Sequence, residues 1–369
     1  MIGHKRIPSR EGGVEIVVEE LSKRLIDLDY DVDAYNRSGY HVSGREFEQT
    51  HGRHARRFGH IRIITIPTFQ NGKLNAIVYT VLATIRALFG HYDVLHYHAE
   101  GPCAMLWLPR FFGKRIVATI HGLDWQRAKW GNFASKVLKD GEKNAVKYAD
   151  EIIVLSKNVQ QYFKDTYGRD THFIPNGINR PAKVDIDLTA KKYGITSNEY
   201  ILFLARLVPE KGVHYLIEAF EGVKTDKKLV IAGGGSNSKE YMTHIHEMAQ
   251  KDDRIIFTNF IQGRMLEELF SNAYLFVLPS DVEGMALSLL EAMSYGNCCV
   301  VSDIPENTEV VEDKAVTFKK GDIEDLRSKL EMLLGDESKV EQYRASSADF
   351  ICGKYNWDDV VAETVKLYH

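Results

Sequence analysis

The sequence lacks the features that would indicate a disulfide-rich, membrane-spanning or nucleic-acid-binding protein. Only four of its 369 residues are cysteine, and no pair has zinc-ligand spacing or suggests a disulfide framework. The net charge is only -4, which indicates no nucleic-acid partner. The longest apolar helix expected, Ala76 to Phe89, contains Arg86 and is too short to span a bilayer. Few cysteines and the lack of a recognisable leader favour a cytoplasmic protein.

Several cofactor and catalytic motifs are also missing. Neither the dinucleotide pattern G-x-G-x-x-G nor the Walker pattern is present, so NAD binding and ATP hydrolysis are not supported. No G-x-S-x-G elbow and no metal-like cluster of His, Cys and carboxylates occurs. The D-x-D triplet at 31–33 alternates along an expected strand, and the triplet at 185–187 lies in a linker. We therefore expect no metal and no other cofactor.

What is present is an alternation of short apolar runs and helical patterns, which indicates parallel sheets covered by helices. The composition, 44% hydrophobic and 27% charged, is that of a soluble protein long enough for two domains. Twelve strands are predicted, at Val32–Tyr35, Arg62–Ile66, Val94–Tyr97, Ile116–Ile120, Glu151–Leu155, His172–Ile174, Ile201–Ala205, Lys228–Ala232, Ile255–Thr258, Tyr274–Leu278, Cys298–Ser302 and Ala315–Phe318.

Helices are predicted around and between these strands. They lie at Val14–Leu28, Asn75–Phe89, Pro102–Phe111, Phe133–Tyr148, Asn158–Thr166, Val213–Val223, Lys239–Gln250, Arg264–Asn272, Ala286–Tyr295, Ile323–Leu334, Glu337–Ile351 and Trp357–Tyr368. The segment 175–178 closes the first series, and 180–187 is a plausible linker. The fold class is α/β, with two doubly wound parallel-sheet domains whose ligands bind at the carboxyl ends of the strands.

The chain opens on what reads as the last residues of a strand, Met1 to Gly3, so we expect a natural start further upstream or a truncated chain. The loop that follows contains three cations and ends in Gly12-Gly13 ahead of a helix. These glycines would let backbone N–H groups approach an anion at the helix start. A tight solvated turn is the alternative interpretation.

The stretch 274–293 reads as a buried strand, a short loop and a helix. Glu283 lies in the loop, and Glu291 lies about two helical turns beyond Gly284. Gly284 allows close backbone approach, and the N–H groups of Met285, Ala286 and Leu287 point out of the helix start. The pattern predicts a phosphate site, whereas the alternative is an ordinary acid near a helix N-terminus.

Three further stretches follow predicted strands. Arg206 and Lys211 would converge on a diphosphate, unless they form an ordinary surface pair. His121 would donate to a sugar hydroxyl or a phosphate, unless it is a structural histidine. The glycines of 233–235 allow close approach to a nucleotide, or form a flexible loop, and 259–262 is a candidate nucleobase contact. The residues selected from these last two stretches are Gly233, Gly235 and Ile261.

Together these motifs resemble glycosyltransferase family four, retaining nucleotide-sugar enzymes of the GT-B fold. The resemblance rests on the glutamates of Glu-Gly-Met-Ala-Leu-Ser-Leu-Leu-Glu, on Arg-Leu-Val-Pro-Glu-Lys-Gly, on Gly12-Gly13 and on Pro-Asn-Gly at 175–177. The opening Ile-Pro-Ser-Arg-Glu-Gly-Gly-Val-Glu further resembles bacterial rhamnosyltransferases of polysaccharide assembly. The implied domains are 1–178 for the acceptor and 179–354 for the donor, with a final helix, 355–369, packing back on the first.

The resemblance also implies roles. Arg206, Lys211 and the amides of Met285 to Leu287 would hold the diphosphate, Glu291 the ribose and Glu283 the donor sugar, with His121 touching that sugar. The departing phosphate would assist the acceptor hydroxyl; Glu283 as a covalent nucleophile is the less favoured alternative.

The implied activity is metal-independent, retaining hexosyl transfer from a UDP-, GDP- or dTDP-sugar to a saccharide or lipid-linked acceptor. The alternatives are a GT-B nucleotide-sugar epimerase and a non-catalytic sugar-nucleotide sensor. Residues 1–175 hold 25 Lys+Arg against 19 Asp+Glu. One hypothesis is therefore that the basic stretch Arg53–Arg62 and the helix Ala76–Phe89 contact the inner face of the cell membrane. The alternative is a solvated loop and a core helix.

Overall fold

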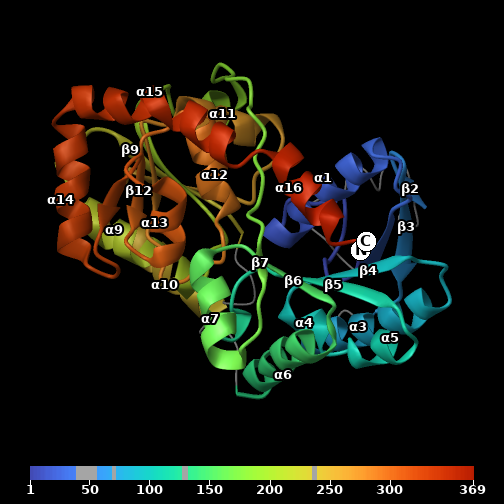
Figure 1. Ribbon diagram of the computed structural model, residues 1–369. Coiled ribbons are helices and arrows are strands. Elements are labelled where there is room, and N and C mark those ends of the chain that lie inside the picture. The colour runs from blue at the N-terminus through green and yellow to red at the C-terminus, as the bar shows by residue number, and fades with distance from the viewer. Residues whose placement is uncertain (39–55, 69–71, 127–131, 235–238) are drawn as a thin grey trace. The chain divides into compact units, whose positions relative to one another are not determined.

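The computed structural model describes residues 1–38, 56–68, 72–126, 132–234 and 239–369 (Figure 1). Contacts between residues divide the chain into two compact units. Unit 1 consists of Met1–Gly177 together with Trp357–His369, and unit 2 consists of Ile178–Asn356. Each unit is an α/β structure built on a mainly or wholly parallel sheet, so the predicted fold class is confirmed.

Unit 1 contains two runs of parallel strands. The first comprises β1 (Asp33–Arg37) and β3 (Ile61–Ile66), with the short β2 (Arg57–Phe58) antiparallel to β3. The second comprises β4 (Val94–His98), β5 (Arg115–Ile120), β6 (Glu151–Val154) and β7 (His172–Phe173).

The first two residues of the chain connect these runs. The N–H of Tyr35 in β1 donates to the carbonyl of Met1 at 3.0 Å, and Ile2 exchanges backbone hydrogen bonds with β4, at 3.0 Å to His96 and 2.8 Å from His98. Ile2 thus lies in a parallel bridge beside Tyr97, in agreement with the prediction that the chain opens on the end of a strand.

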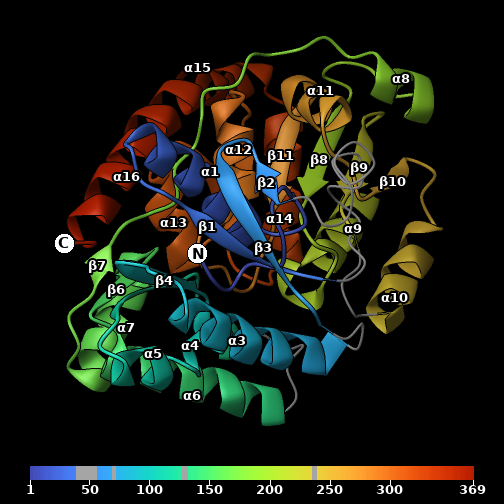
Figure 2. The ribbon, with the colours of Figure 1, turned by 90° about the vertical axis from the view of Figure 1, so that its right-hand side faces the viewer.

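Helices α3 (Gly72–Leu88), α4 (Glu100–Cys103), α5 (Trp107–Phe111) and α6 (Asn132–Tyr148) lie on one face of the second run of strands, as Figures 1 and 2 show. Alternate strand residues such as Leu95 and Tyr97 point into a core with Tyr79 and Ala83 of α3. The remaining helices that the structure describes in this unit are α1 (Gly13–Asp27), α7 (Lys157–Tyr167) and α16 (Trp357–Lys366), with the short η1 (Asp124–Gln126).

The carboxyl-terminal segment is part of unit 1. Helix α16 contacts α1, and the Arg24 guanidinium lies over the Trp357 ring, 5.4 Å from its centroid. Beyond the helix, the Tyr368 hydroxyl lies 2.8 Å from Nδ1 of His96, and Arg115 donates to the carbonyl of Leu367 at 2.8 Å. These contacts fix the end of the chain against β4 and β5.

The described residues of unit 2 form a sheet of six parallel strands in the order β10-β9-β8-β11-β12-β13. The strands are β8 (Tyr200–Leu204), β9 (Lys228–Ala232), β10 (Ile255–Asn259), β11 (Leu275–Leu278), β12 (Cys299–Ser302) and β13 (Val316–Phe318). The central strands β8 and β11 are continuous apolar runs because both of their faces are covered.

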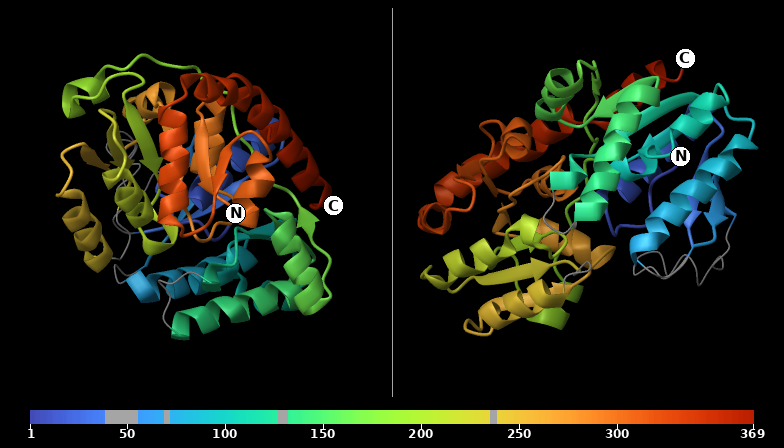
Figure 3. Two further views of the ribbon diagram at one scale, coloured as in Figure 1. Left: turned by 90° about the vertical axis from the view of Figure 1, so that its left-hand side faces the viewer. Right: turned by 90° about the horizontal axis from the view of Figure 1, so that it is seen from below.

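One core of unit 2 joins alternate strand residues, among them Ile201, Phe203 and Val277, to helices α9 (Val213–Glu221), α10 (Lys239–Ala249) and α14 (Ile323–Leu334). On the other face, Phe276 lies 6.1 Å from Phe270 of α11, measured between ring centroids. The other helices are α8 (Leu188–Tyr193), η2 (Pro209–Lys211), α11 (Arg264–Asn272), α12 (Leu287–Ser294), α13 (Pro305–Val311) and α15 (Glu337–Lys354). Figure 3 gives two further views of these helices.

Some predicted elements were wrong or missing. The single helix predicted at Pro102–Phe111 is two short helices, α4 and α5, joined by a turn. Pro109 has no N–H to donate to the carbonyl of Met105, and its ring would clash there, so one continuous helix is disfavoured. The short elements β2, α8 and α13 were not predicted, because each has too few residues to show a period.

All four cysteines are free, and Cys298 and Cys299 are buried in the core. Across the part of the chain that the structure describes, no helix has the length and apolarity needed to cross a membrane.

Candidate active site

In unit 2 the strand order reverses between β8 and β11. Strands β9 and β10 extend the sheet from β8 to one side, and β12 and β13 extend it from β11 to the other. In open parallel sheets, ligands bind beyond the carboxyl ends of the strands that flank such a reversal. The segments that follow these two strands carry Arg206 and Lys211 after β8, and Glu283 after β11. The topology therefore places three predicted site residues at one end of the sheet.

Lys211 and Glu283 are in direct contact. The Lys211 ammonium donates to Oε1 of Glu283, and the hydroxyl of Ser280 donates to the same oxygen at 2.6 Å. The Glu283 side chain is only 5% exposed and that of Lys211 only 13%. Two donors on one carboxylate oxygen, in a nearly buried position, fix the orientation of this acid.

A series of buried hydrogen bonds holds the backbone of Ser280 in place. The hydroxyl of Ser302, at the end of β12, donates to the carbonyl of Ser280 at 2.5 Å. Asn307 of α13 in turn donates to the Ser302 hydroxyl at 3.1 Å. All three side chains are almost completely inaccessible to solvent. The segment that carries Glu283 is thus anchored to two neighbouring elements.

The two loops are also pressed together along their backbones. Gly212 has a φ of +66°, and a Cβ at this position would lie 2.0 Å from the carbonyl oxygen of Pro279. The N–H of Asp281 donates to the carbonyl of Glu210 at 2.9 Å. Only glycine fits at position 212, because a side chain would separate the Lys211 loop from the Glu283 loop.

Helix α12 begins at Leu287, with Ala286 as its cap in an extended conformation. Gly284, Met285, Ala286 and Leu287 are all buried, and Glu291 is half-buried in the second turn. The first N–H groups of a helix have no acceptor within the helix, and they favour anions. The predicted helix start is therefore confirmed to within one residue.

Gly233, which follows β9, has to be glycine for a reason that involves no ligand. Gly233 has a φ of +150°, and a Cβ there would lie 1.8 Å from the carbonyl oxygen of Ala205. The neighbouring Gly234 accepts a hydrogen bond from the N–H of Leu207 at 3.0 Å. Position 233 must be glycine for packing against the chain itself, whether or not a nucleotide approaches.

The remaining predicted residues of unit 2 are placed as follows. Arg206, directly beyond the end of β8, is half-buried. Ile261, shortly after β10, is buried. Gly235 lies outside the described residues, so its predicted contact with the donor stays a prediction.

In unit 1, the Gly12-Gly13 loop is closed by a carboxylate of the chain itself. Glu15 of α1 is buried, and its Oε1 accepts a hydrogen bond from the N–H of Lys5 at 2.8 Å. Its Oε2 lies 2.4 Å from where a Cβ of Gly12 would be. Both glycines lie at the start of α1, as predicted. The prediction of an anion site at these glycines did not include the buried carboxylate of Glu15 beside them.

The predicted His121 belongs to a row of histidines. It follows β5, and its Nε2 lies 3.1 Å from Nδ1 of His98, the last residue of β4. The rings of His98 and His96 stack with centroids 4.3 Å apart. Burial lowers the pKa of His98 and of His96 well below the ordinary value, so both rings are neutral.

Glu100, two residues after His98, and Glu142 of α6 form a buried pair of acids. Glu142 accepts hydrogen bonds from Trp125 at 2.9 Å, from Tyr162 at 2.8 Å and from Tyr167. Among the described residues, the carboxyl oxygens of Glu100 have no comparable set of donors. Burial, and then the nearby acidic charges, raise the pKa of Glu100 to about 10, so it is protonated in the folded state.

We expect Glu100→Gln to stabilise the protein at neutral pH by about 1–3 kcal/mol. The unfolded chain releases the Glu100 proton above its ordinary pKa, whereas the folded chain keeps it. This residue therefore lowers the stability increasingly as the pH rises from about 4.5 towards 10. Urea unfolding at pH 5.5 and 8.5 checks this, because the gain should be larger at pH 8.5.

The neighbouring substitution Glu142→Gln is the matched comparison. It should destabilise the protein, because an amide cannot accept from all three donors that the carboxylate binds. Equal effects of the two substitutions, or a loss of stability in Glu100→Gln that grows with pH, would contradict the assignment of a neutral Glu100.

Both halves of the chain match models of glycosyltransferase families. Residues 11–180 match "Glycosyltransferase Family 4", and residues 185–349 match "Glycosyl transferases group 1". The chain belongs to the GT-B glycosyltransferases of family 4. An uncharacterised glycosyltransferase of Methanocaldococcus jannaschii, MJ1607, is 26% identical over 98% of this chain and 95% of its own length. A phosphatidyl-myo-inositol mannosyltransferase of Mycobacterium leprae is 27% identical over 76% of this chain and 74% of its own length.

Solved structures share the fold of this glycosyltransferase. Sucrose-phosphate synthase of Thermosynechococcus elongatus superposes with a TM-score of 0.81 at 20% identity, covering 100% of this chain and 94% of that one. Anabaena HepE, solved in complex with UDP and glucose, gives a TM-score of 0.80 at 16% identity, covering 99% and 97%. At these identities the likeness shows the GT-B fold alone.

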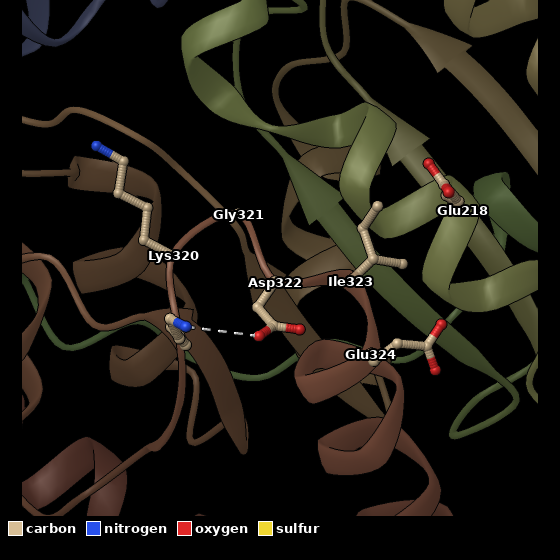
Figure 4. Close-up of a pocket in the computed structure, with 7 residues that line it drawn as sticks. Glu218, Lys320, Gly321, Asp322, Ile323 and Glu324 are labelled. Atoms are coloured by element: carbon tan, nitrogen blue, oxygen red, sulfur yellow. Dashed lines mark ion pairs between the residues drawn. The ribbon is translucent and has the colours of Figure 1, made fainter.

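A surface cavity of about 410 Å³ lies elsewhere in unit 2 of the glycosyltransferase (Figure 4). It is lined by the β13–α14 connection and by Glu218 of α9, and its charged groups are of both signs, including Lys319 and Asp322, which are 4.0 Å apart. It contains none of the predicted site residues.

Two residues that contact predicted site residues, Ser280 in unit 2 and His98 in unit 1, were not predicted. Ser280 comes directly after the apolar run and Pro279, three positions before Glu283, and a polar residue at a strand end was the available signal. His98 is the last residue of β4, the strand that pairs with β5, and His121 follows β5. The alternation of His96 and His98 was the signal available in the sequence.

No cluster of three or more metal-ligating side chains is found among the described residues. Asp33 of the discounted D-x-D triplet is bound by Arg62 and Tyr92.

Proposed function

We propose that this glycosyltransferase moves a hexosyl group from a nucleotide diphosphate sugar to a saccharide or lipid-linked acceptor in bacterial polysaccharide or glycoconjugate synthesis. The reaction retains the anomeric configuration and needs no metal ion. The observation that carries the proposal is the contact of Lys211 and Ser280 with Glu283 at the point where the strand order reverses.

Each part of the donor has an assigned partner. Arg206, Lys211 and the N–H groups at the start of α12 neutralise the leaving diphosphate, which gains charge as the bond to the sugar breaks. An ammonium has three N–H bonds, so Lys211 can contact Glu283 and a phosphate oxygen together. Glu283 binds the donor sugar and Glu291 the ribose hydroxyls. Gly233 and Ile261 adjoin the nucleoside, and the assignment of Gly235, Gly12, Gly13 and His121 to the donor stays a prediction.

The reaction exchanges one bond for another at the anomeric carbon. The bond to the diphosphate oxygen breaks, the acceptor oxygen bonds to the same face of the sugar, and the acceptor proton passes to the departing phosphate. HepE, which has the same fold, has been solved with UDP-glucose, which supports a nucleotide-sugar donor here. The mannosyl- and kanosaminyltransferases among the relatives support a hexosyl group, and a rhamnosyl donor stays a prediction.

A thermal-shift series with UDP, GDP, dTDP and their sugars, with and without EDTA, tests the donor assignment. A ligand that binds only the folded state raises the melting temperature according to its affinity. A rise with one diphosphate that persists in EDTA supports the metal-free site and identifies the base. The absence of any rise, or its loss in EDTA, would contradict the proposal. NMR of the product's anomeric centre then decides between retention and inversion.

We also expect Ser280→Ala to lower kcat by about tenfold while changing the KM for the donor little. A hydrogen bond to a charged group is worth about 1.5–3 kcal/mol, and without it the Glu283 carboxylate is less firmly oriented. Steady-state kinetics measure this separation of kcat from KM.

Ser294→Ala is the matched control for Ser280→Ala. Ser294 is also nearly buried, but its hydroxyl donates at 2.8 Å to a backbone carbonyl of α12, that of Glu291. An equal fall in kcat in both variants would remove the case for a positioning role of Ser280.

A further inference from the structure

Helix α3 is apolar on the side that faces the core and also on the side that faces outward. Tyr79 and Ala83 are completely buried in unit 1. On the outward side, Ile77, Leu82 and Ile85 are 40%, 38% and 40% exposed. A helix that is hydrophobic all round is normally covered on every side. The outward side of α3 is therefore a surface that favours a partner.

The aromatic side chains of α5 and of the loops that follow α3 and α5 extend this surface. Phe89 is 75% exposed, Phe111 81%, Phe112 58% and Trp107 46%. Helices α3 and α5 are in contact, and Lys114 donates to the carbonyl of Gly90 at 3.4 Å, which joins the segments that follow them. Figures 2 and 3 show α3 on the outside of the sheet. The apolar face comprises Ile77, Leu82, Ile85, Phe89, Trp107, Phe111 and Phe112.

Most charges of the same segments are positive. Residues 72–90 and 101–115 contain no Asp or Glu, whereas they contain Lys73, Arg86, Arg110, Lys114 and Arg115, and the loop after α3 adds the exposed Asp93. Because Arg110 pairs with Asp150 at 2.6 Å and Arg115 with Glu151 at 3.6 Å, Arg86 and Lys114 supply the positive charge that these acids leave unbalanced. A second copy of this chain on the same face would bring like charges together, which disfavours that partner. Exposed Phe and Trp with flanking Arg and Lys match an anionic lipid surface, where aromatic rings lie at the headgroup level.

We propose that the apolar face is the surface by which this chain docks on an anionic lipid bilayer. The Phe and Trp side chains enter the headgroup boundary, and Arg86 and Lys114 contact anionic headgroups. This surface differs from the membrane-binding surface hypothesised from the sequence. That hypothesis combined the Ala76–Phe89 helix with the stretch Arg53–Arg62, whereas the apolar face combines α3 with α5. Residues 53–55 of that stretch lie outside the described residues.

Co-sedimentation of the full chain with vesicles tests the proposal. We expect binding to vesicles of equal parts phosphatidylcholine and phosphatidylglycerol, weaker binding to pure phosphatidylcholine, and weakening by salt. The double variant Phe89→Ser, Phe111→Ser should lower the affinity for the mixed vesicles by at least about tenfold, because two large apolar side chains no longer leave water.

The matched control is the double variant Leu28→Ser, Leu188→Ser. These leucines are 52% and 43% exposed; Leu28 directly follows α1, Leu188 begins α8 of unit 2, and neither belongs to the apolar face. Their loss should leave vesicle binding unchanged. Circular dichroism melting of each variant shows whether it remains folded.

Failure of the wild type to bind mixed vesicles overturns the proposal, and so does an equal loss in both double variants. Sedimentation velocity tests the alternative that the apolar face binds a second copy of the chain. If the wild type does not bind vesicles but forms a dimer, and the variant Phe89→Ser, Phe111→Ser is a monomer, the face is a dimer interface. The vesicle assay contains no nucleotide. A missing nucleotide response in the thermal-shift series would therefore refute the proposed function and leave the vesicle result intact.

Discussion

Glu283→Gln lowers kcat by about a thousandfold or more, while the affinity for the free nucleotide diphosphate changes little. In the proposed reaction Glu283 contacts the donor sugar, whereas Arg206 and the start of α12 hold the diphosphate. The amide has nearly the shape of the acid, but it removes the negative charge that faces Lys211 in a nearly buried position. Single-turnover kinetics and calorimetric nucleotide titration measure the two effects separately.

The same substitution has a second expected result. Without ligand, Lys211 faces a neutral amide, so the melting temperature should fall, because a nearly buried ion pair is disrupted from one side. A diphosphate supplies new negative charge to Lys211, so the nucleotide-induced rise in melting temperature should equal or exceed that of the wild type.

Asp281→Asn is the control, because Asp281 lies in the same loop and its carboxylate accepts from the hydroxyl of Tyr215 at 3.2 Å. It should retain most of the activity. A Glu283→Gln variant as active as this control, or one that loses only nucleotide binding, would show that Glu283 does not act on the donor sugar.

Gly212→Ala destabilises the protein by about 3 kcal/mol or more and lowers activity at the same time. The added Cβ would lie 2.0 Å from the carbonyl oxygen of Pro279 and 2.9 Å from the Tyr215 ring, in a backbone conformation with φ of +66°. A backbone carbonyl cannot rotate away as a flexible side chain can, so the loops that carry Lys211 and Glu283 must separate.

Gly168→Ala isolates the contribution of the backbone conformation. Gly168 has a φ of +62°, but a Cβ there would have nothing within 4 Å. Its substitution should cost only about 1 kcal/mol and leave activity unchanged. Chemical unfolding of both variants gives the difference, which is the steric part. Similar losses of stability would show that the loops tolerate the added methyl group.

The sequence was sufficient for elements that are long and strongly periodic. The twelve predicted strands and most helices are present, because burial on both faces of a parallel strand leaves a continuous apolar run. Prediction failed at Pro102–Phe111, where an apolar run hid the turn at 104–106 that Pro109 favours, and at β2, α8 and α13, where a few residues carry no period. The α/β class survived these errors because it depends on the alternation and not on the ends of any one element.

The candidate site was predicted as separate residues and motifs. Arg206, Lys211, Glu283 and the start of α12 were recognisable because polar residues or glycines followed apolar strands. The contact of Lys211 with Glu283, and the part played by Ser280, were not predictable. Both features require β8 and β11 to be adjacent strands in the sheet. Which strands become adjacent depends on contacts between segments that are far apart in the sequence. The same reason applies to Gly233, whose constraint comes from Ala205, just past the end of the neighbouring strand β8.

The sequence by itself determined the α/β class, the strands and the identities of the residues available for binding a phosphorylated sugar. These properties follow from local periods and from the chemistry of side chains near strand ends. The tertiary structure decided which of these residues meet, which glycines are fixed by packing, and that the outer side of α3 and the aromatic residues of α5 form one exposed surface. Such decisions require strand order and helix packing, because both join residues that no local pattern relates.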